Sequence, residues 1–185
     1  MKNKRIKQNK NLPIVSKQIA GPRVMLDSSF IVSILNSQDT NHKCTEALFR
    51  FIGPYNCRFH MPLYVYAEAL SRLIQQGKTV AESLKIMDDF LNKIPGALIV
   101  GAGPTLKEIK ERYKKIARKK IRLLRSNDFY IATEGILSGA LILTCDYEMY
   151  LRTKKYYPDI FFIATHSKKY KNDIPIFTKR FISMV

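Results

Sequence analysis

Short apolar runs alternate with longer stretches of helical periodicity along this chain. Five of the runs have the length and apolar content of buried strands, and polar or turn-forming residues bound them. They cover residues 23–26, 57–61, 97–100, 140–144 and 160–164. Strands separated by helices are typical of a parallel sheet with helices on its faces. The pattern therefore predicts an α/β domain with a mainly parallel sheet of about five strands.

Helix signals fill the segments between these runs. A helix is expected directly after Asp27, with Asp27 or Ser28 as its N-cap, and a capping box of Thr79 and Glu82 begins another. The helix expected after Pro62 is apolar on most of its surface. The remaining helices are expected at 42–52, 105–125, from 126 onward and at 146–156.

Basic residues are gathered in three blocks. The 185 residues include 32 Lys and Arg against 15 Asp and Glu, which gives a formal net charge of +17. Residues 1–20, 107–125 and 151–185 hold 24 of these bases and only 4 of the acids. A basic shell around a mildly acidic centre suits a polyanion such as a nucleic acid, although a basic surplus also serves solubility. One face of the 105–125 helix is expected to bind that partner through Lys114, Lys115, Arg118, Lys119, Arg122 and Arg125. The alternative is that this face is merely solvated.

Composition narrows the remaining classes. With 46% hydrophobic and 25% charged residues, the chain fits one globular domain. No apolar run approaches the roughly 18 residues of a membrane span, and no secretory signal is evident, so a cytoplasmic protein is expected. The cysteines lack C-x-x-C spacing and the histidines lack zinc-site spacing. We expect a basic flexible arm at 1–20, the folded domain at 21–165 and a basic C-terminal tail at 166–185.

Four acids compete as candidate functional residues. Asp27 follows the first strand, Asp146 follows the fourth, Asp128 opens a helix and Glu68 interrupts an apolar helix. Ligands of parallel sheets bind outside the carboxyl ends of the strands. Taken singly, each acid also has a structural explanation as a helix cap, a first-turn anion or half of an ion pair. The segment 126–148, however, holds four acids and no Lys or Arg, and our hypothesis is that it forms half of a divalent-metal site.

In this order and with these surroundings, the four acids resemble those of the PIN-domain ribonucleases, in particular the toxin-type members of toxin–antitoxin pairs. The matching pieces are VMLDSSFIVSIL, VYAEALSRL and NDFYIATEGILSGALILTCD, which ends on Thr144 and Asp146. The resemblance covers residues 24–164. Cys145 departs from the basic residue that many toxin members carry there, and both ends of the chain lie outside the pattern.

The resemblance implies a PIN-like three-layer sandwich and a metal-dependent endoribonuclease that uses Mg²⁺ or Mn²⁺. Asp27, Glu68 and Asp128 are implied as core ligands, with Asp146 as an outer ligand or water orienter. Ser28 and Thr144 are expected to hold the carboxylates by hydrogen bonds. Crowded carboxylates need a cation to offset their repulsion, and hard oxygen ligands favour these two ions.

The implied partners are RNA and, for a toxin, a small antitoxin protein, while a homodimer stays open and no membrane is implied. Two other functions also stay open. One is an RNA-processing nuclease resembling the PIN proteins of rRNA maturation, which the basic extensions would suit. The other is a non-catalytic RNA-binding protein that keeps the fold, although candidate acids at all four positions count against it.

Overall fold

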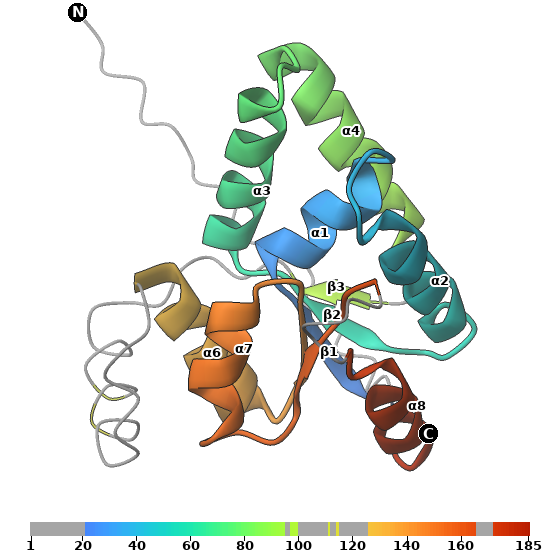
Figure 1. Ribbon diagram of the computed structural model, residues 1–185, viewed down its shortest axis with the longest axis vertical. Helices are drawn as coiled ribbons and strands as arrows, with labels where there is room; N and C mark the ends of the chain where they lie inside the picture. The colour runs from blue at the N-terminus through green and yellow to red at the C-terminus, as the bar shows by residue number, and fades with distance from the viewer. Residues whose placement is uncertain (1–20, 95–96, 100–110, 112–113, 115–125, 166–171) are drawn as a thin grey trace, which may run out of the picture.

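A single parallel sheet forms the centre of the molecule (Figure 1). The computed structural model describes residues 21–94, 97–99, 111, 114, 126–165 and 172–185. In this part of the chain five strands lie in the order β3-β2-β1-β4-β5, and each neighbouring pair is parallel. The strands are β1 (Arg23–Leu26), β2 (Arg58–His60), β3 (Ala97–Ile99), β4 (Leu141–Thr144) and β5 (Ile160–Phe162). The predicted α/β class with a parallel sheet is thus confirmed.

Helices cover both faces of this sheet and give the three layers of the fold. Helices gather on both sides of the sheet (Figure 1). The first group is α1 (Ser28–Leu35), α2 (His42–Ile52), α3 (Leu63–Gln75) and α4 (Val80–Lys93). The second group is α6 (Ser126–Ser138) and α7 (Tyr147–Lys154). The predicted caps are present, since Asp27 caps α1 and Thr79 forms a capping box with Glu82 at α4.

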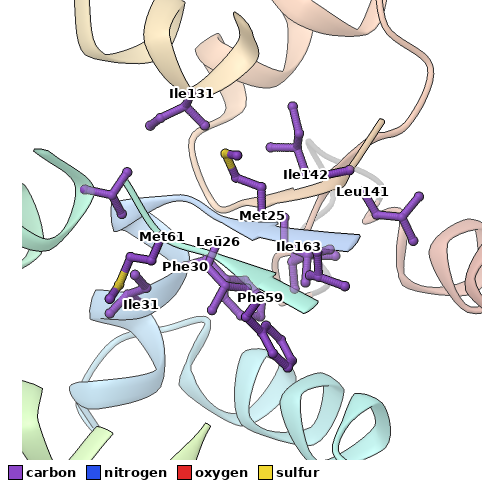
Figure 2. Close-up of a cluster of buried hydrophobic side chains, with 14 of the residues drawn as sticks. Met25, Leu26, Phe30, Ile31, Phe59, Met61, Ile131, Leu141, Ile142 and Ile163 are labelled. Atoms are coloured by element: carbon purple, nitrogen blue, oxygen red, sulfur yellow. The ribbon is translucent and has the colours of Figure 1, made fainter. Parts of the chain in front are cut away.

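The alternation of side chains along the strands builds a core on each face. Met25 pairs with Ile142 in the register of β1 and β4, and both side chains point toward Ile131 of α6 (Figure 2). Phe30 and Phe59 lie on the opposite side of the sheet (Figure 2). All five side chains are buried, because successive residues of a strand face opposite ways and both faces are covered.

Two glycines set the approach of α6 to β4. A Cβ added to Gly135 would lie only 2.3 Å from Cδ1 of Ile142, so the missing side chain lets the helix pack directly on the strand. Gly139 then turns the chain with a φ of 63°, a left-handed value that favours glycine. This turn leads the chain from the end of α6 directly into β4.

The last part of the predicted C-terminal tail is helical. Helix α8 (Ile174–Ile182) buries Phe177 against Phe161 of β5 and Phe181 against Tyr55. Ile176 of the same helix, in contrast, is 57% exposed. Residues 172–185 therefore pack on the domain through one face of a helix.

Two other expectations from the sequence differ from the structure or fall outside it. Of the apolar coat of α3, only Val65, Ala69 and Leu73 are buried, because a helix on a core buries one stripe of residues at i, i+4 and i+8. The expected basic helix at 105–125 lies outside the described residues except for Glu111 and Lys114, which are both helical. Within the part of the chain that the structure describes, no helix is both long and apolar enough to cross a membrane.

Candidate active site

The sheet order places two strand ends side by side where a ligand is expected. The chain runs outward from β1 through β2 to β3, and then returns to the other side of β1 for β4 and β5. Strands β1 and β4 are therefore neighbours whose connections leave in opposite directions. Ligands of open parallel sheets bind at such a switch point, outside the carboxyl ends of the strands. Asp27 follows β1 there, and Asp146 lies two residues after the end of β4.

Asp27 is held at this position by donors from both strand ends. Its own N–H donates to the Leu143 carbonyl at 3.0 Å, which continues the pairing of β1 with β4. The backbone N–H groups of Ser28 and Ser29 donate to its two carboxylate oxygens at 2.8 and 3.4 Å. The hydroxyls of Ser29 and Thr144 both donate to Oδ2, the second over 2.9 Å. The Ser28 hydroxyl makes a longer bond of 3.5 Å to Oδ1. The carboxylate is thus a helix cap that also accepts side-chain hydroxyls, one of them from a residue 117 positions away.

Burial makes the charged form of Asp27 costly. The residue is 3% exposed, and this desolvation raises the pKa of its carboxyl above the ordinary 3.8. The hydrogen bonds from Ser29 and Thr144 lower the pKa, but they do not cancel the effect of burial. The negative charge of Glu68 raises the pKa further, and the positive charge of Arg72 lowers it. Asp27 therefore lies close enough to this pair to interact with it electrostatically.

Thr144 connects Asp27 to Asp146. While its hydroxyl donates to Asp27, the same oxygen accepts the backbone N–H of Asp146 at 2.9 Å. The Asp146 carboxylate then caps α7 by accepting the N–H of Met149 at 2.9 Å. Ser29 makes a parallel link, because its hydroxyl accepts the N–H of Cys145 at 2.9 Å. The ends of β1 and β4 thus form one hydrogen-bonded unit, in which Thr144 has the orienting position expected for it.

Glu68 and Asp128 lie on helices beyond this unit. Oε1 of Glu68 accepts a hydrogen bond from Nη2 of Arg72 over 2.8 Å, with the two side chains 23% and 41% exposed. Oε2 accepts a weak bond of 3.4 Å from the side-chain amide of Asn127. Asp128 is the next residue, half-buried in the first turn of α6. The Glu68–Asn127 bond therefore places the first turn of α6 beside Glu68 of α3.

The four acids converge on one edge of the sheet without closing into a metal cage. Asp27 and Asp146 are linked through Thr144, Glu68 interacts electrostatically with Asp27, and Asp128 adjoins the residue that binds Glu68. Among the described residues, no three His, Cys, Asp or Glu side chains form a group that could hold a metal ion. Of the predicted nucleic-acid contacts, Lys114 is exposed and pairs with Glu111 at 2.9 Å. The other five lie outside the described residues: Lys115, Arg118, Lys119, Arg122 and Arg125.

A family model described as PIN domain matches residues 24–155, which include all four acids. The chain belongs to the PIN domain family. PIN domains are in general nucleases, and they typically use divalent metal ions. A comparison with curated proteins gives no match.

Two solved structures resemble this PIN domain at low identity. Mycobacterium tuberculosis VapC20, a toxin that cleaves the sarcin–ricin loop, has 14% identity and a TM-score of 0.49 over 69% of this chain and 93% of its own. A domain of a functionally unknown protein from Methanocaldococcus jannaschii has 17% identity and a TM-score of 0.49 over 82% of this chain and 97% of its own. At these values the two matches add nothing to the family assignment.

The donor chemistry of the acidic edge fits the metal ions that PIN domains use. The candidate ligands are carboxylate oxygens, which are hard donors preferred by Mg²⁺ and Mn²⁺. The nearest thiol is no competing ligand, because burial keeps the pKa of Cys145 far above its usual range and the sulfur protonated. Glu68 already has a cationic partner in Arg72. A bound ion would therefore have to draw Glu68 and Asp128 toward Asp27.

Three residues of this edge were missed or read differently from the sequence. Ser29, and not only the expected Ser28, holds the Asp27 carboxylate with its hydroxyl. The pairing of Arg72 with Glu68 was considered as an ordinary surface ion pair, yet Arg72 also influences Asp27. Asn127 was not considered at all. The i, i+2 spacing of Ser29 after a strand-end Asp was a usable signal, whereas the Asn127 contact spans 59 positions and leaves none.

Proposed function

We propose that this PIN domain protein is a metal-dependent endoribonuclease of the toxin type. It would hydrolyse RNA phosphodiester bonds at the edge where β1 and β4 end, using Mg²⁺ or Mn²⁺ held by Asp27, Glu68, Asp128 and Asp146. The toxin assignment is supported by the resemblance of the segments around these acids to toxin-type sequences. A small antitoxin protein and a cytoplasmic location belong to the same proposal, which leaves a homodimer open.

The carrying observation is the environment of Asp27. A carboxylate used only as a helix cap has no need of a second pair of donors, yet Asp27 accepts hydroxyls from Ser29 and Thr144 in addition to the backbone N–H groups of α1. These donors fix the orientation of both oxygens in a buried place, although burial raises the pKa of the acid. A buried acid with a perturbed pKa is typical of functional sites.

Each residue of the edge has a distinct part in this proposal. Asp27 presents a fixed carboxylate, and Thr144 positions both Asp27 and the backbone of Asp146. Glu68 and Asp128 complete the ligand set from α3 and α6. Arg72 is released from Glu68 and becomes available to an RNA phosphate. A bound divalent ion supplies activation of the attacking water and neutralisation of charge on the phosphodiester.

The charge distribution supports RNA as the substrate. A site built from carboxylates repels a phosphodiester unless cations and basic side chains offset the repulsion. The basic block at 107–125 supplies ten Lys and Arg next to the segment that carries Asp128. Removal of Lys114, Arg118 and Arg122 should then lower the salt dependence of RNA binding by about one unit of slope for each lost phosphate contact.

A processing nuclease is the second candidate function. It is favoured by the basic blocks at both ends of the chain, which suit a large structured RNA better than a compact substrate. The two candidates share the site and differ in substrate. Growth arrest on expression, relieved by a protein encoded beside this chain, would support the toxin; normal growth with defective rRNA ends after gene deletion would support processing.

Replacement of Asp27 by Asn tests the proposal at the site. Asn keeps the size and the capping oxygen but removes the charge that a cation needs, so Mg²⁺-dependent cleavage of RNA by the pure protein should fall by at least about a hundredfold. Asp88→Asn is the matched control, because Asp88 is exposed on α4. Full cleavage by the Asp27→Asn protein would overturn the proposal, whereas loss in both variants would indicate a general defect.

A further inference from the structure

A polar pocket opens beside the acidic edge, and none of the four acids lines it. Its volume is about 520 Å³, within the range of about 300–1,000 Å³ that is usual for small-molecule sites. It lies between α1, the loop from α1 to α2, and the C-terminal end of α3. Its polar lining comes mainly from Ser33, Asp39, Asn41, Arg72, Gln75 and Gln76.

The pocket is continuous with the environment of Asp27 and Glu68. Ser29, whose hydroxyl binds Asp27, also lines the pocket, as does Cys145 at the end of β4. Arg72 forms the boundary on the other side, because it pairs with Glu68 while lining the pocket. A molecule that binds at the acidic edge through a charged group can therefore place the adjoining part of its structure in this pocket.

One side of the pocket is fixed by internal hydrogen bonds. Asp39 accepts the Ser33 hydroxyl at 2.8 Å and the backbone N–H of Asn41 at 2.7 Å with the same oxygen, Oδ1. Oδ1 of Asn41 accepts the N–H of Thr165 at 2.9 Å. These bonds hold the loop from α1 to α2 in place. Among the described residues, Oδ2 of Asp39 accepts no hydrogen bond.

The other side of the pocket carries unused amide groups. Gln75 and Gln76 are exposed, and neither side chain makes a hydrogen bond to another residue in the described ranges. A primary amide has both donors and acceptors, which is the combination that reads the edge of a nucleobase. Val32 adds an aliphatic surface to this lining. The guanidinium of Arg72 matches phosphate geometry.

We infer that this pocket binds one nucleoside of the RNA strand, next to the scissile phosphate, with Arg72 contacting the phosphate between them. The inference rests on the proposed ribonuclease function and adds a specificity subsite to it. Gln75 and Gln76 contact the base, and Asp39 accepts from a base or ribose donor. The loss of one or two such hydrogen bonds corresponds to about a tenfold fall in kcat/KM.

The test compares a Gln75→Ala/Gln76→Ala double variant with the wild-type chain. Cleavage of a single-stranded RNA with randomised positions shows the base preference, and one good substrate gives kcat/KM. We expect the double variant to lose its base preference at one position beside the cleaved bond. Its kcat/KM should fall about tenfold. Gln38→Ala is the matched control, because Gln38 is an exposed glutamine in the loop from α1 to α2 that does not line this pocket. An unchanged base preference in the double variant overturns the inference.

A binding readout separates the pocket from the reaction. Metal-free wild-type protein is titrated with AMP, GMP, CMP and UMP while its amide NMR signals are recorded. At least one nucleotide should shift the signals of Asn41, Gln75 and Gln76, and the double variant should not respond. Nucleotide binding of this kind without any RNA cleavage supports the pocket and counts against the proposed function. If the wild-type protein cleaves RNA but does not respond to any nucleotide, and the double variant cleaves RNA like the wild type, the proposed function stands. The inference about the pocket is then overturned.

Discussion

The two halves of the acidic edge are held in very different ways. At the ends of β1 and β4, Asp27 and Asp146 belong to one network of backbone and hydroxyl donors, and the Thr144 oxygen bonds to both residues. On α3 and α6, Glu68 is held by a partly exposed ion pair with Arg72 and by a 3.4 Å bond from Asn127. The strand half is fixed by the fold, whereas Glu68, in the helix half, is held less strongly.

This difference explains why the four carboxylates meet at one edge without a metal cage. Crowded carboxylates repel one another when no cation is bound. The strand half tolerates the buried charge of Asp27 because backbone N–H groups and hydroxyls donate to both of its carboxylate oxygens. The helix half satisfies Glu68 with a cation of its own, Arg72. We therefore expect Asp27 to be the anchor of the proposed metal site, with Glu68 and Asp128 joining it when an ion binds.

The largest expected effect that separates the halves is on Glu68. Glu68→Gln should lower cleavage by about a hundredfold or more, because a ligand charge is lost. It should change the free energy of unfolding by no more than about 1 kcal/mol, since a partly exposed ion pair contributes little. Glu46→Gln is the control, because Glu46 forms the same i, i+4 pair with Arg50 on α2. Thermal unfolding and RNA cleavage of both variants measure the two effects, and an active Glu68→Gln protein would contradict a role for the helix half.

Thr144→Val tests the strand half and should have an intermediate effect on cleavage. The variant removes the hydroxyl that joins Asp27 to the backbone of Asp146, so cleavage should fall by about 10- to 100-fold. Because it leaves buried polar groups without partners, it should also cost about 1–3 kcal/mol of stability. Thr133→Val is the control, since the buried Thr133 hydroxyl donates only within its own helix, to the Phe129 carbonyl at 2.6 Å. Unchanged cleavage by Thr144→Val would show that the network is structural.

The smallest expected effect is a pH dependence of stabilisation by metal. Because burial raises the pKa of Asp27, protonation of this carboxyl is more favourable in the folded than in the unfolded chain. Its contribution to metal-free stability is therefore fully present below the unfolded pKa of 3.8 and is lost as pH rises through the raised folded pKa. Metal binding needs the ionised form, so the gain in Tm on adding Mn²⁺ should grow over that same rise. Thermal unfolding across this pH range measures it, and a pH-independent gain would exclude Asp27 as a ligand.

Much of this arrangement followed from local patterns in the sequence. Most of the strands are largely apolar, although β2 has the sequence RFH, and Asp27, Thr79 and Gly139 are strong local signals for caps and turns. For that reason the parallel sheet and the placement of Asp27 and Asp146 after strand ends were predictable. Glu68 and Asp128 were also candidates from the sequence, but their role as ligands was implied only by the resemblance to PIN proteins, whose family the model match confirms.

Contacts between distant segments were not predictable in the same way. The buried stripe of α3 depends on which of its apolar faces meets α1 and α4, and its sequence is apolar on both sides. The contact of Asn127 with Glu68 and the polar pocket beside Arg72 depend on how helices pack, which periodicity does not encode. The distinction between a fixed strand half and a more weakly held Glu68 is therefore a result of the structure alone.

The most direct test of Asp27 as the anchor is paramagnetic broadening by Mn²⁺. Small additions of Mn²⁺ to isotope-labelled protein should broaden the amide NMR signals of Ser28, Ser29, Cys145 and Asp146, which surround the carboxylate. The Asp88→Asn protein should behave like the wild type, and the Asp27→Asn protein should show none of this broadening. Equal broadening at these residues in the Asp27→Asn protein, or broadening confined to other parts of the molecule, would contradict the proposed site.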